Sequence, residues 1–335
     1  MKLLISSHMF CPSVGGIETM SSVLAHACVI AGHEVKLVTQ TPSVELEDFR
    51  FEVIRQPGLK QLYDLVRWCD VYFQNGISLQ LACPLVFVPR PWVVAHHTWI
   101  SRVNGDRGWQ DLLKQYLLRF ATSISVSRAI AKHLPVPSIT IPNCYRDEFR
   151  QLPGVPRTKQ LVFLGRLVSD KGADILLRAL ADLKQYKLSP ELTIIGVGPE
   201  EQVLRRLAED VGVAEQVNFV GQKTGLELVQ LLNAHEILVV PSRWQEPFGL
   251  VALEGAACGC VVVGSAGGGL KEAIGPCGTT FANGDTKALA QQLALLLSSP
   301  RELKARRDRA EAHLSSYRST EVASAYLKVL EGAAR

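Results

Sequence analysis

Residues 237–264 read ILVVPSRWQEPFGLVALEGAACGCVVVG, and this stretch is the clearest indication of the fold class. An apolar run, Ile237–Pro241, leads through a polar loop into a helix-like segment, Leu250–Ala257, and a second apolar run, Cys260–Gly264, follows at once. Continuous Val, Ile and Leu runs, in place of strict alternation, are typical of strands buried on both faces of a parallel sheet. The stretch therefore predicts a β–α–β unit.

The same rhythm of short apolar runs and longer amphipathic segments extends along the chain. Alternating strands and helices of this kind predict a doubly wound α/β fold. Further strands are expected at Lys2–Ser6, Glu34–Thr39, Gln160–Gly165, Leu192–Gly196 and Val217–Gly221, and further helices at Gly15–Ala31, Ala173–Tyr186, Glu200–Val211, Leu226–Ala234 and Ser319–Ala334.

The segment Gln151–Arg157 contains two prolines and a glycine, which stop a helix, and a fresh strand–helix series begins after it. At 335 residues the chain has room for two domains. We expect an N-terminal Rossmann-like domain at residues 1–153 and a C-terminal one at 157–315. Residues 316–335 should form a helix that packs back toward the N-terminal domain.

Composition limits the classes of partner. The net charge of +4 is too small to indicate nucleic acid, and it suits an anionic small ligand, a membrane surface, or no charged partner at all. No signal peptide and no membrane-spanning run is visible, so any membrane contact should be peripheral. The eight cysteines include no C-x-x-C pair, which favours reduced core thiols in a cytoplasmic protein over disulfides or zinc.

In open α/β sheets ligands bind at the carboxyl ends of strands, so the loops there are the candidates for the site. Gly15 and Gly16 follow the first strand, and paired glycines at a helix start form either an anion site or a plain tight turn. Arg166 and Lys171 follow the strand that ends at Gly165. They are either two cations that neutralise a diphosphate or two solvated surface charges.

Glu246 and Glu254 are the most informative residues. Glu246 lies in the loop after Ile237–Pro241, and Glu254 lies among apolar residues on the following helix. A carboxylate in apolar company needs hydrogen-bond partners, and ligand hydroxyls can supply them. Two acids on one strand–loop–helix unit favour a ligand site over an ordinary solvated glutamate.

The spacing E-P-F-G-L-V-A-L-E of Glu246–Glu254 resembles the E-x7-E signature of the family 4 retaining glycosyltransferases, which have the GT-B fold. Gly165–Gly172, the Gly-Val-Gly-Pro of residues 196–199 and the early Pro12 to Glu18 loop are similar to the same family in the same order. The resemblance implies two Rossmann-like doubly wound domains facing a central cleft.

The resemblance also implies roles for single residues. Arg166 and Lys171 hold the diphosphate and stabilise the leaving group, Glu246 binds hydroxyls of the transferred sugar, and Glu254 binds the ribose. The remaining nucleotide-sugar-binding residues implied are Gly16, Gly165, Gly198, Gln222, Lys223, Phe248, Gly249, Leu250 and Val251.

The family also places a histidine near the sugar, at the end of an N-terminal-domain strand. The run Trp92–His97 ends in two histidines. His97 is the expected catalytic one and His96 the alternative. Asn75 and Cys144 depart from the family's usual histidine and glycine, which leaves the acceptor side less well defined.

The expected function is that of a hexosyltransferase moving a hexose, by family frequency glucose from UDP-glucose, to an acceptor hydroxyl in glycan or polysaccharide biosynthesis. No cofactor and no metal are expected, since the chain lacks a D-x-D pair and cations can replace a metal on the diphosphate. The expected partners are the nucleotide-sugar donor and a glycan or lipid-linked acceptor, at the inner membrane face if the enzyme is peripheral. The alternatives are a nucleotide-sugar epimerase of the same fold and a non-catalytic nucleotide-sugar-binding module.

Overall fold

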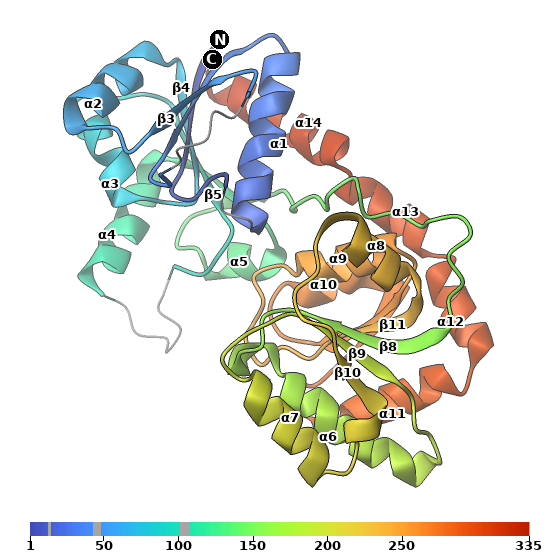
Figure 1. The fold of residues 1–335 in the computed structure, drawn as a ribbon. Coiled ribbons are helices and arrows are strands. Elements are labelled where there is room, and N and C mark those ends of the chain that lie inside the picture. The colour runs from blue at the N-terminus through green and yellow to red at the C-terminus, as the bar shows by residue number, and fades with distance from the viewer. Residues whose placement is uncertain (13–14, 43–47, 101–107, 335) are drawn as a thin grey trace. The chain divides into compact units, whose positions relative to one another are not determined.

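The structure, a computed structural model, describes residues 1–12, 15–42, 48–100 and 108–334. The chain divides into two compact units. Unit 1 contains Met1–Cys144 and Ser319–Arg335, and unit 2 contains Tyr145–Arg318. Each is built around a parallel sheet with helices on both faces (Figure 1).

In the described part of unit 1, seven parallel strands form one sheet in the order β3-β2-β1-β4-β5-β6-β7. The chain winds outward from β1 in one direction and from β4 in the other, so the switch point lies between these two neighbours. The strands are β1 Lys2–Ser7, β2 Glu34–Thr39, β3 Glu52–Arg55, β4 Val71–Asn75, β5 Trp92–His96, β6 Thr122–Ser125 and β7 Ser138–Thr140.

Two hydrophobic cores cover the two faces of this sheet. On one face, Leu3, Ile5 and Phe73 pack with residues of α1 and α14; on the other, Leu4 and Tyr72 pack with residues of α2 and α3. The helices of unit 1 are α1 Gly16–Ile30, α2 Leu59–Trp68, α3 Leu79–Ala82, α4 Trp109–Leu117, α5 Arg128–His133 and α14 Ser319–Ala333, with single 3-10 turns at Cys83–Val86 and Leu118–Phe120.

In the described part of unit 2, six parallel strands follow the order β10-β9-β8-β11-β12-β13, with the switch point between β8 and β11. Helices α6, α7 and α11 lie on one face and α8, α9 and α10 on the other (Figure 1). The strands are β8 Lys159–Leu164, β9 Leu192–Ile195, β10 Val217–Phe219, β11 His235–Val240, β12 Val261–Ser265 and β13 Gly278–Phe281. The helices are α6 Ala173–Leu183, α7 Glu201–Asp210, α8 Gly225–Asn233, α9 Leu250–Ala257, α10 Leu270–Ile274, α11 Thr286–Leu297, α12 Pro300–Arg307 and α13 Ala310–Leu314, and 3-10 turns lie at Ser169–Lys171, Lys184–Tyr186, Ala214–Gln216, Gly275–Cys277 and Ser315–Tyr317.

The predicted doubly wound α/β fold with two Rossmann-like sheets is confirmed. Strands β1, β4, β5, β11 and β12 are buried along almost their whole length, as their continuous apolar runs predict. Six of the eight cysteines are buried, and burial raises the pKa of Cys69 and of Cys277 to about 11, so these thiols stay neutral in the core.

The boundary between the units lies earlier than the predicted segment Gln151–Arg157, since unit 2 begins at Tyr145. Side-chain contacts explain the difference: Asn233 of unit 2 donates from Nδ2 to the carbonyl of Arg150 at 2.9 Å and accepts the backbone N–H of Leu152 at 2.8 Å. These bonds attach the residues before the prolines to unit 2.

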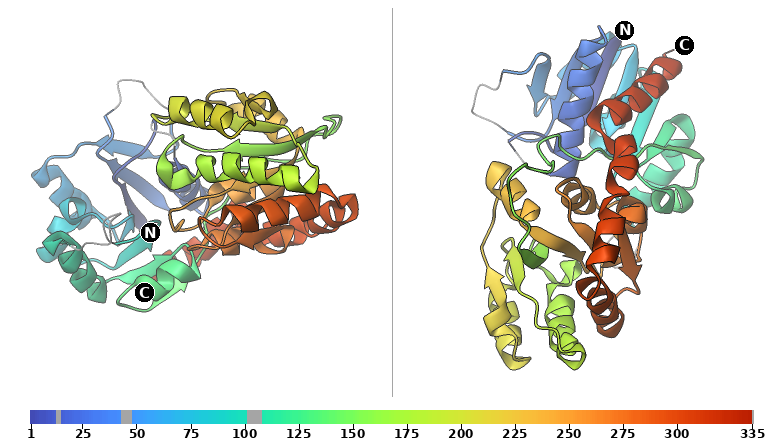
Figure 2. Two further views of the ribbon diagram at one scale, coloured as in Figure 1. Left: turned by 90° about the horizontal axis from the view of Figure 1, so that it is seen from below. Right: turned by 90° about the vertical axis from the view of Figure 1, so that its right-hand side faces the viewer.

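The C-terminal helix α14 belongs to unit 1, although all of unit 2 precedes it in sequence. It packs against α1, β4 and β5, and Figure 2 shows it running alongside α1. Its Tyr326 is fully buried with the ring centroid 5.9 Å from that of Phe73. No helix in the described ranges is both long and apolar enough to cross a bilayer.

Candidate active site

Two loops leave the carboxyl ends of the neighbouring strands β8 and β11, at the switch point of unit 2. They contact each other directly. The backbone N–H groups of Arg243 and Trp244 donate to the carbonyl of Asp170 at 2.9 and 3.2 Å. A Cβ on Gly172, which has φ +67°, would lie 2.1 Å from the carbonyl oxygen of Pro241, so only glycine fits there. The fold thus joins the two loops that carry the predicted cations and acids.

Lys171 and Glu246 meet across these loops. The Lys171 ammonium donates to Glu246 Oε1 at 2.6 Å, and the Ser242 hydroxyl donates to the same oxygen at 2.8 Å. The two charged side chains are 27% and 13% exposed, so the pair is only partly shielded from solvent. The predicted phosphate-binding cation and sugar-binding acid therefore form a single cluster with Ser242, which the sequence analysis had not assigned a role.

Arg166 follows Gly165 at the end of β8 and is exposed. Among the described residues no hydrogen bond or ion pair involves its guanidinium. Close backbone packing fixes the turn around it. A Cβ on Gly196 would lie 1.9 Å from the carbonyl oxygen of Gly165, and one on Gly198 would lie 2.3 Å from that of Leu167. Arg166 thus projects from a rigid turn with its charge available to a ligand.

A glycine-rich turn after β12 supports the Glu246 loop, and the sequence analysis did not identify it. The Gly269 N–H donates to the carbonyl of Glu246 at 2.7 Å. A Cβ on Gly268, which has φ +65°, would lie 2.1 Å from that carbonyl oxygen. The Gly267–Gly269 run after an apolar strand was the available signal.

Helix α9 begins at Leu250, directly after Gly249 in the left-handed region with φ +115°. Phe248 is buried and its ring centroid lies 5.9 Å from that of Tyr317. Leu250 and Val251 form the first turn of α9, where backbone N–H groups lack intrahelical partners and the helix dipole favours an anion. The backbone N–H groups of Leu250 and Val251 lie where an anionic ligand at the carboxyl edge of the sheet could reach them, whereas the Phe248 ring is buried.

Glu254 is buried on α9, and an arginine that the sequence analysis missed is bound to it. Arg146 Nε donates to Glu254 Oε1 at 3.2 Å. Burial raises the pKa of the Glu254 carboxyl, and the charge and hydrogen bond of Arg146 oppose that rise. Arg146 is distant in sequence and belongs to no motif, so only the fold reveals the pair.

Gln222 and Lys223 lie between β10 and α8, at the same edge of the sheet as the other loops. Gln222 is exposed, and the Lys223 ammonium lies 2.5 Å from Glu227 Oε1, one helical turn further on. Both side chains therefore stand on the surface at the carboxyl ends of the strands.

The predicted residues of unit 1 lie at its own switch point. Gly16 begins α1 after β1, whereas Ser13 and Val14 of the same loop lie outside the described residues. Asn75 at the end of β4 donates from Nδ2 to the carbonyl of Ile17 at 3.0 Å. Its Oδ1 lies 2.5 Å from His97 Nε2. Because the amide nitrogen is occupied as a donor, His97 must donate from Nε2 to Asn75.

Both histidine candidates line one cavity of about 170 Å³, together with Trp99, Asp111 and Lys114. Burial lowers the pKa of His97 to about 4, an effect that Asn143 opposes, and lowers the pKa of His96 to about 3. Both rings are therefore neutral near pH 7. His96 Nε2 lies 3.3 Å from the hydroxyl of Ser123.

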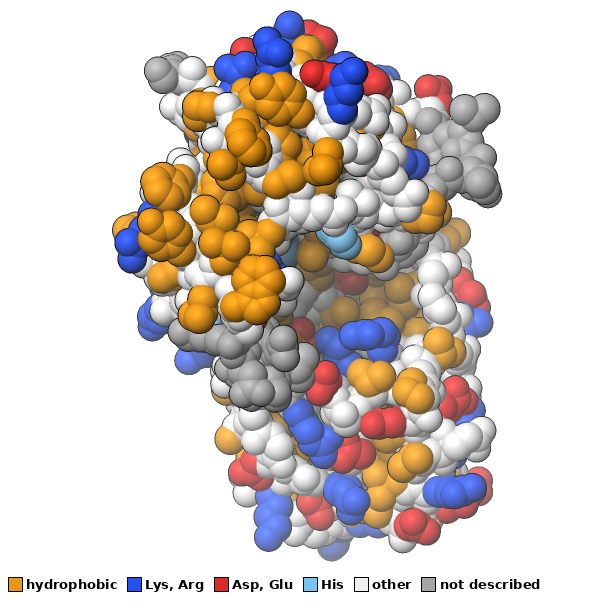
Figure 3. Space-filling view, turned by 90° about the vertical axis from the view of Figure 1, so that its left-hand side faces the viewer, with side chains coloured by type: hydrophobic (Ala, Val, Ile, Leu, Met, Phe, Trp, Pro, Cys, Tyr) orange, Lys and Arg blue, Asp and Glu red, His pale blue; other side chains and the backbone are white. Residues whose placement is uncertain are grey.

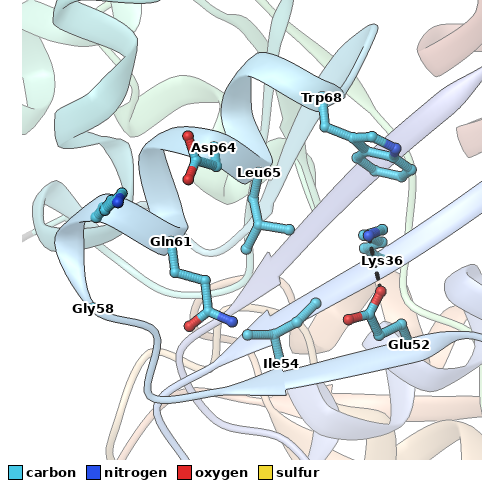
Figure 4. A pocket seen from close by; sticks show the side chains of 9 residues that line it. Lys36, Glu52, Ile54, Gly58, Gln61, Asp64, Leu65 and Trp68 are labelled. Atoms are coloured by element: carbon cyan, nitrogen blue, oxygen red, sulfur yellow. Dashed lines mark ion pairs between the residues drawn. The ribbon is translucent and has the colours of Figure 1, made fainter.

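A second hollow in unit 1, of about 570 Å³, lies between β3 and α2 (Figure 4). In it Lys36 Nζ lies 2.9 Å from Glu52 Oε2 and 4.8 Å from the ring centroid of Trp68. The hollow extends along α2 from Gly58 to Trp68, beside the edge strand β3 and two strands away from the switch point between β1 and β4.

The two doubly wound parallel sheets define a protein of the GT-B fold. Solved structures with that fold match nearly the whole chain. They include Anabaena Alr3699/HepE in complex with UDP, with a TM-score of 0.84, 21% identity and coverage of 99% of this chain and 100% of that one. Sucrose-phosphate synthase from Thermosynechococcus elongatus has a TM-score of 0.81 at 20% identity, with 99% and 98% covered. At such identities the likeness concerns the fold alone.

Residues 145–313, half of the chain, match the family described as glycosyl transferases group 1. The chain belongs to this family, which confirms the predicted class of protein. A GDP-mannose-dependent alpha-(1-6)-phosphatidylinositol monomannoside mannosyltransferase of Mycolicibacterium smegmatis is 32% identical over 222 residues, covering 62% of this chain and 58% of that protein. A D-inositol 3-phosphate glycosyltransferase of Corynebacterium jeikeium is 37% identical over 182 residues, covering 51% of this chain and 42% of that protein. The chain thus spans about half the length of these relatives.

Proposed function

We propose that the protein is a retaining hexosyltransferase of family 4 that moves a hexose from a nucleoside diphosphate sugar to an acceptor hydroxyl. The observation that carries the proposal is the cluster at the switch point of unit 2. Lys171, Glu246 and Ser242 meet within hydrogen-bond distance, and Arg166 projects unpaired among the described residues from the adjoining turn. Two cations and a carboxylate on loops fixed by backbone packing suit a ligand that carries phosphates and hydroxyls together.

In this proposal Arg166 and Lys171 bind the diphosphate of the donor. Phosphate oxygens compete with Glu246 for the Lys171 ammonium, and the released Glu246 carboxylate then accepts hydroxyls of the sugar. Glu254 accepts the ribose hydroxyls. The remaining proposed contacts in unit 2 are Phe248, Gly249, Leu250 and Val251 along the phosphates, Gln222 and Lys223 at the base, and Gly165 and Gly198. The family resemblance alone assigns Gly16 of unit 1 to the diphosphate and His97 to the sugar.

The chemical step needs no protein nucleophile. The bond between C1 of the sugar and the phosphate oxygen breaks, and the acceptor oxygen forms its bond to C1 on the same face. The acceptor proton passes to a non-bridging phosphate oxygen of the departing diphosphate. Arg166 and Lys171 stabilise the negative charge that grows on that diphosphate, which is the main catalytic contribution in this scheme. The same two charges make a divalent metal unnecessary.

The proposed donor is UDP-glucose, on family frequency, and the fold neighbour Alr3699/HepE is described in complexes with UDP and glucose. One relative is named for GDP-mannose, so the nucleotide has to be tested. A panel of UDP- and GDP-hexoses should include one that raises the melting temperature in proportion to its affinity. Arg166→Ala should abolish most transfer from that donor without unfolding the protein.

Unchanged transfer by Arg166→Ala would remove the basis of the assignment. Donor incubated alone distinguishes the remaining classes, because an epimerase returns an isomerised sugar and a binding module returns unaltered donor. The acceptor proposed is a glycan or a lipid-linked saccharide, as expected for glycan or polysaccharide biosynthesis.

The proposal includes a peripheral contact of unit 1 with the inner face of a membrane. Helix α4 and the turn after it contain large apolar residues at helical spacing, and no residue of α4 is buried. Figure 3, which faces this side, shows hydrophobic side chains gathered there. The exposed residues of this α4 surface are Trp109, Leu112, Leu113, Tyr116 and Phe120.

The α4 surface suits lipid because aromatic and basic side chains occur on it together. The Arg119 guanidinium lies 5.2 Å from the ring centroid of Tyr116, and Lys114 is on the same helix. Trp, Tyr and flanking cations are typical of elements that lie in the interface of anionic membranes. Sedimentation with vesicles of anionic phospholipid should capture the protein, and Trp109→Gln with Phe120→Gln should release it. Self-association without vesicle binding would show instead that a second copy covers this surface.

A further inference from the structure

The side chain of Arg146 is fixed by three neighbours in unit 2. Its Nε donates to Glu254 Oε1 at 3.2 Å, and its Nη1 lies 3.0 Å from Glu148 Oε1. The guanidinium carbon lies 4.6 Å from the ring centroid of Phe149, which is itself buried. A planar guanidinium held by two carboxylates and an aromatic face cannot turn away from Glu254 without losing these contacts. Arg146 therefore presents one fixed donor to the Glu254 carboxylate.

Glu254 needs such a partner because of its position on α9. Glu254 is only 7% exposed, and its helix neighbours Leu253 and Gly255 are buried. Burial raises the pKa of the carboxyl; Arg146 opposes the rise, and Glu148 adds to it. The elements packed against α9 are β11, β12, α10 and α13, and their other titratable groups are His235, Glu236, Lys271, Glu272, Glu311 and His313. Arg146 is thus the cation whose charge acts on Glu254.

The hydrogen bond from Arg146 gives the two carboxylate oxygens of Glu254 different surroundings. Arg146 occupies Oε1, whereas no hydrogen bond within the described residues reaches Oε2. A vicinal diol offers two O–H donors, and an ionised carboxylate can accept both of them. A protonated carboxyl cannot, because one of its oxygens has become a donor. Both the charge and the orientation of Glu254 therefore decide how well it binds a ribose.

We propose that Arg146 is a positioning residue of the donor site, which holds Glu254 as an oriented carboxylate and so gives the site its preference for ribonucleotides over 2′-deoxyribonucleotides. The inference rests on the proposed function, in which Glu254 receives the ribose. Arg146 acts through Glu254 and does not itself contact the sugar.

The test compares the affinities of UDP and 2′-deoxy-UDP, and of the two guanine counterparts, for the whole chain by calorimetry between pH 5 and 8. The wild-type protein should prefer the ribonucleotide by about tenfold or more, as expected for a hydrogen bond to a charged group. In Arg146→Gln the preference should fall to about threefold or less, since the carboxyl is no longer held or charged by its partner. Affinity for the 2′-deoxy nucleotide should change little.

The pH profile adds a readout that a purely structural role would not move. Without the Arg146 charge the pKa of Glu254 lies higher, so as the pH falls the variant should lose ribonucleotide affinity at a higher pH than the wild type. Glu148→Gln is the matched control, because it removes the other carboxylate partner of Arg146 and keeps the bond to Glu254. It should keep the wild-type preference.

Arg146→Lys retains the charge without the planar fork, so it should keep the pH profile and lose part of the preference. If circular dichroism shows Arg146→Gln to be unfolded, the nucleotide preference of Arg146→Lys tests the positioning role of Arg146 instead. Equal weakening of both nucleotides, with the ratio and the pH profile unchanged, would overturn the role of Arg146. Failure of the wild-type protein to bind any of the four nucleotides would overturn the proposed function itself, and this role with it.

Discussion

Lys171→Gln is the substitution that most cleanly separates charge from fold in the candidate site. The lysine ammonium lies 2.6 Å from Glu246 Oε1, and Ser242 donates to the same oxygen at 2.8 Å. Glutamine keeps a donor at shorter reach and removes the positive charge. Glu246 keeps Ser242 as a partner in the variant, so its carboxylate is not left without a hydrogen bond.

The expected cost in stability is small and the expected cost in catalysis is large. An exposed ion pair is worth at most about 1 kcal/mol, and breaking a fully buried one costs about 3–5 kcal/mol. The Lys171–Glu246 pair, 27% and 13% exposed, lies between these limits, and with Ser242 still bound we expect a loss of about 1–2 kcal/mol. Removing one cation from a leaving diphosphate should raise the barrier by about 3–4 kcal/mol, a fall of about 10²–10³ in kcat.

The assay is release of nucleoside diphosphate from saturating donor, measured beside urea unfolding of the same protein. Lys36→Gln is a control, because Lys36 is 25% exposed and pairs with Glu52 at 2.9 Å in the hollow between β3 and α2 of unit 1. Because Glu52 is 58% exposed, this variant should lose about 1 kcal/mol or less of stability, and it should lose no activity. If Lys171→Gln keeps its kcat within about threefold, or if both variants lose activity alike, Lys171 does not stabilise the leaving group.

Three further predictions concern pH, backbone packing and metal. Between pH 6.5 and about 4 the unfolded chain binds a proton at His97 that the folded chain excludes, so His97 should lower stability as pH falls through this window, by up to about 3 kcal/mol. His97→Gln should remove this share of the slope in urea titrations and leave the share of His96 and His235, whose pKa values burial lowers to about 3 and about 4; an unchanged slope would contradict the exclusion of a proton at His97. Gly268→Ala places a Cβ 2.1 Å from the Glu246 carbonyl oxygen in a left-handed conformation, so donor affinity should drop, whereas Gly284→Ala, also left-handed but open, should cost stability alone. Excess chelator should leave donor turnover unchanged. Loss of activity in chelator that a divalent ion restores would contradict the proposal that Arg166 and Lys171 alone neutralise the diphosphate.

The fold was predictable because its signal is local. Runs such as Ile237–Pro241 and Cys260–Gly264 mark buried parallel strands, and the structure shifts their bounds by only one or two residues. Unit 2 begins at Tyr145, before the predicted segment Gln151–Arg157, because Asn233 forms hydrogen bonds to Arg150 and Leu152 that bridge more than 80 positions. A proline-rich stretch shows where helices stop, and it does not show which unit binds the residues before it.

The candidate site likewise contains residues that could be predicted from the sequence and residues that could not. Arg166, Lys171 and Glu246 lie in loops and turns, and Glu254 lies on the helix that follows Glu246, so their spacing can be read along the chain. Arg146 could not be found, since its partner Glu254 is 108 positions away and a lone arginine carries no local signal. Gly268 acts through a contact with Glu246 that exists only once β11 and β12 are paired. Ser242 is four positions from Glu246 in the same loop, and its contact depends on the shape of that loop.

Hydrogen exchange of the whole chain with and without UDP or GDP tests nucleotide binding at the unit 2 switch point, because it needs no acceptor. We expect slower exchange in the loops 165–172 and 241–251, which carry Arg166, Lys171 and Glu246 at the carboxyl edge of the unit 2 sheet. Saturating nucleotide that leaves both loops unprotected, or that protects the Lys36–Trp68 hollow instead, would contradict it.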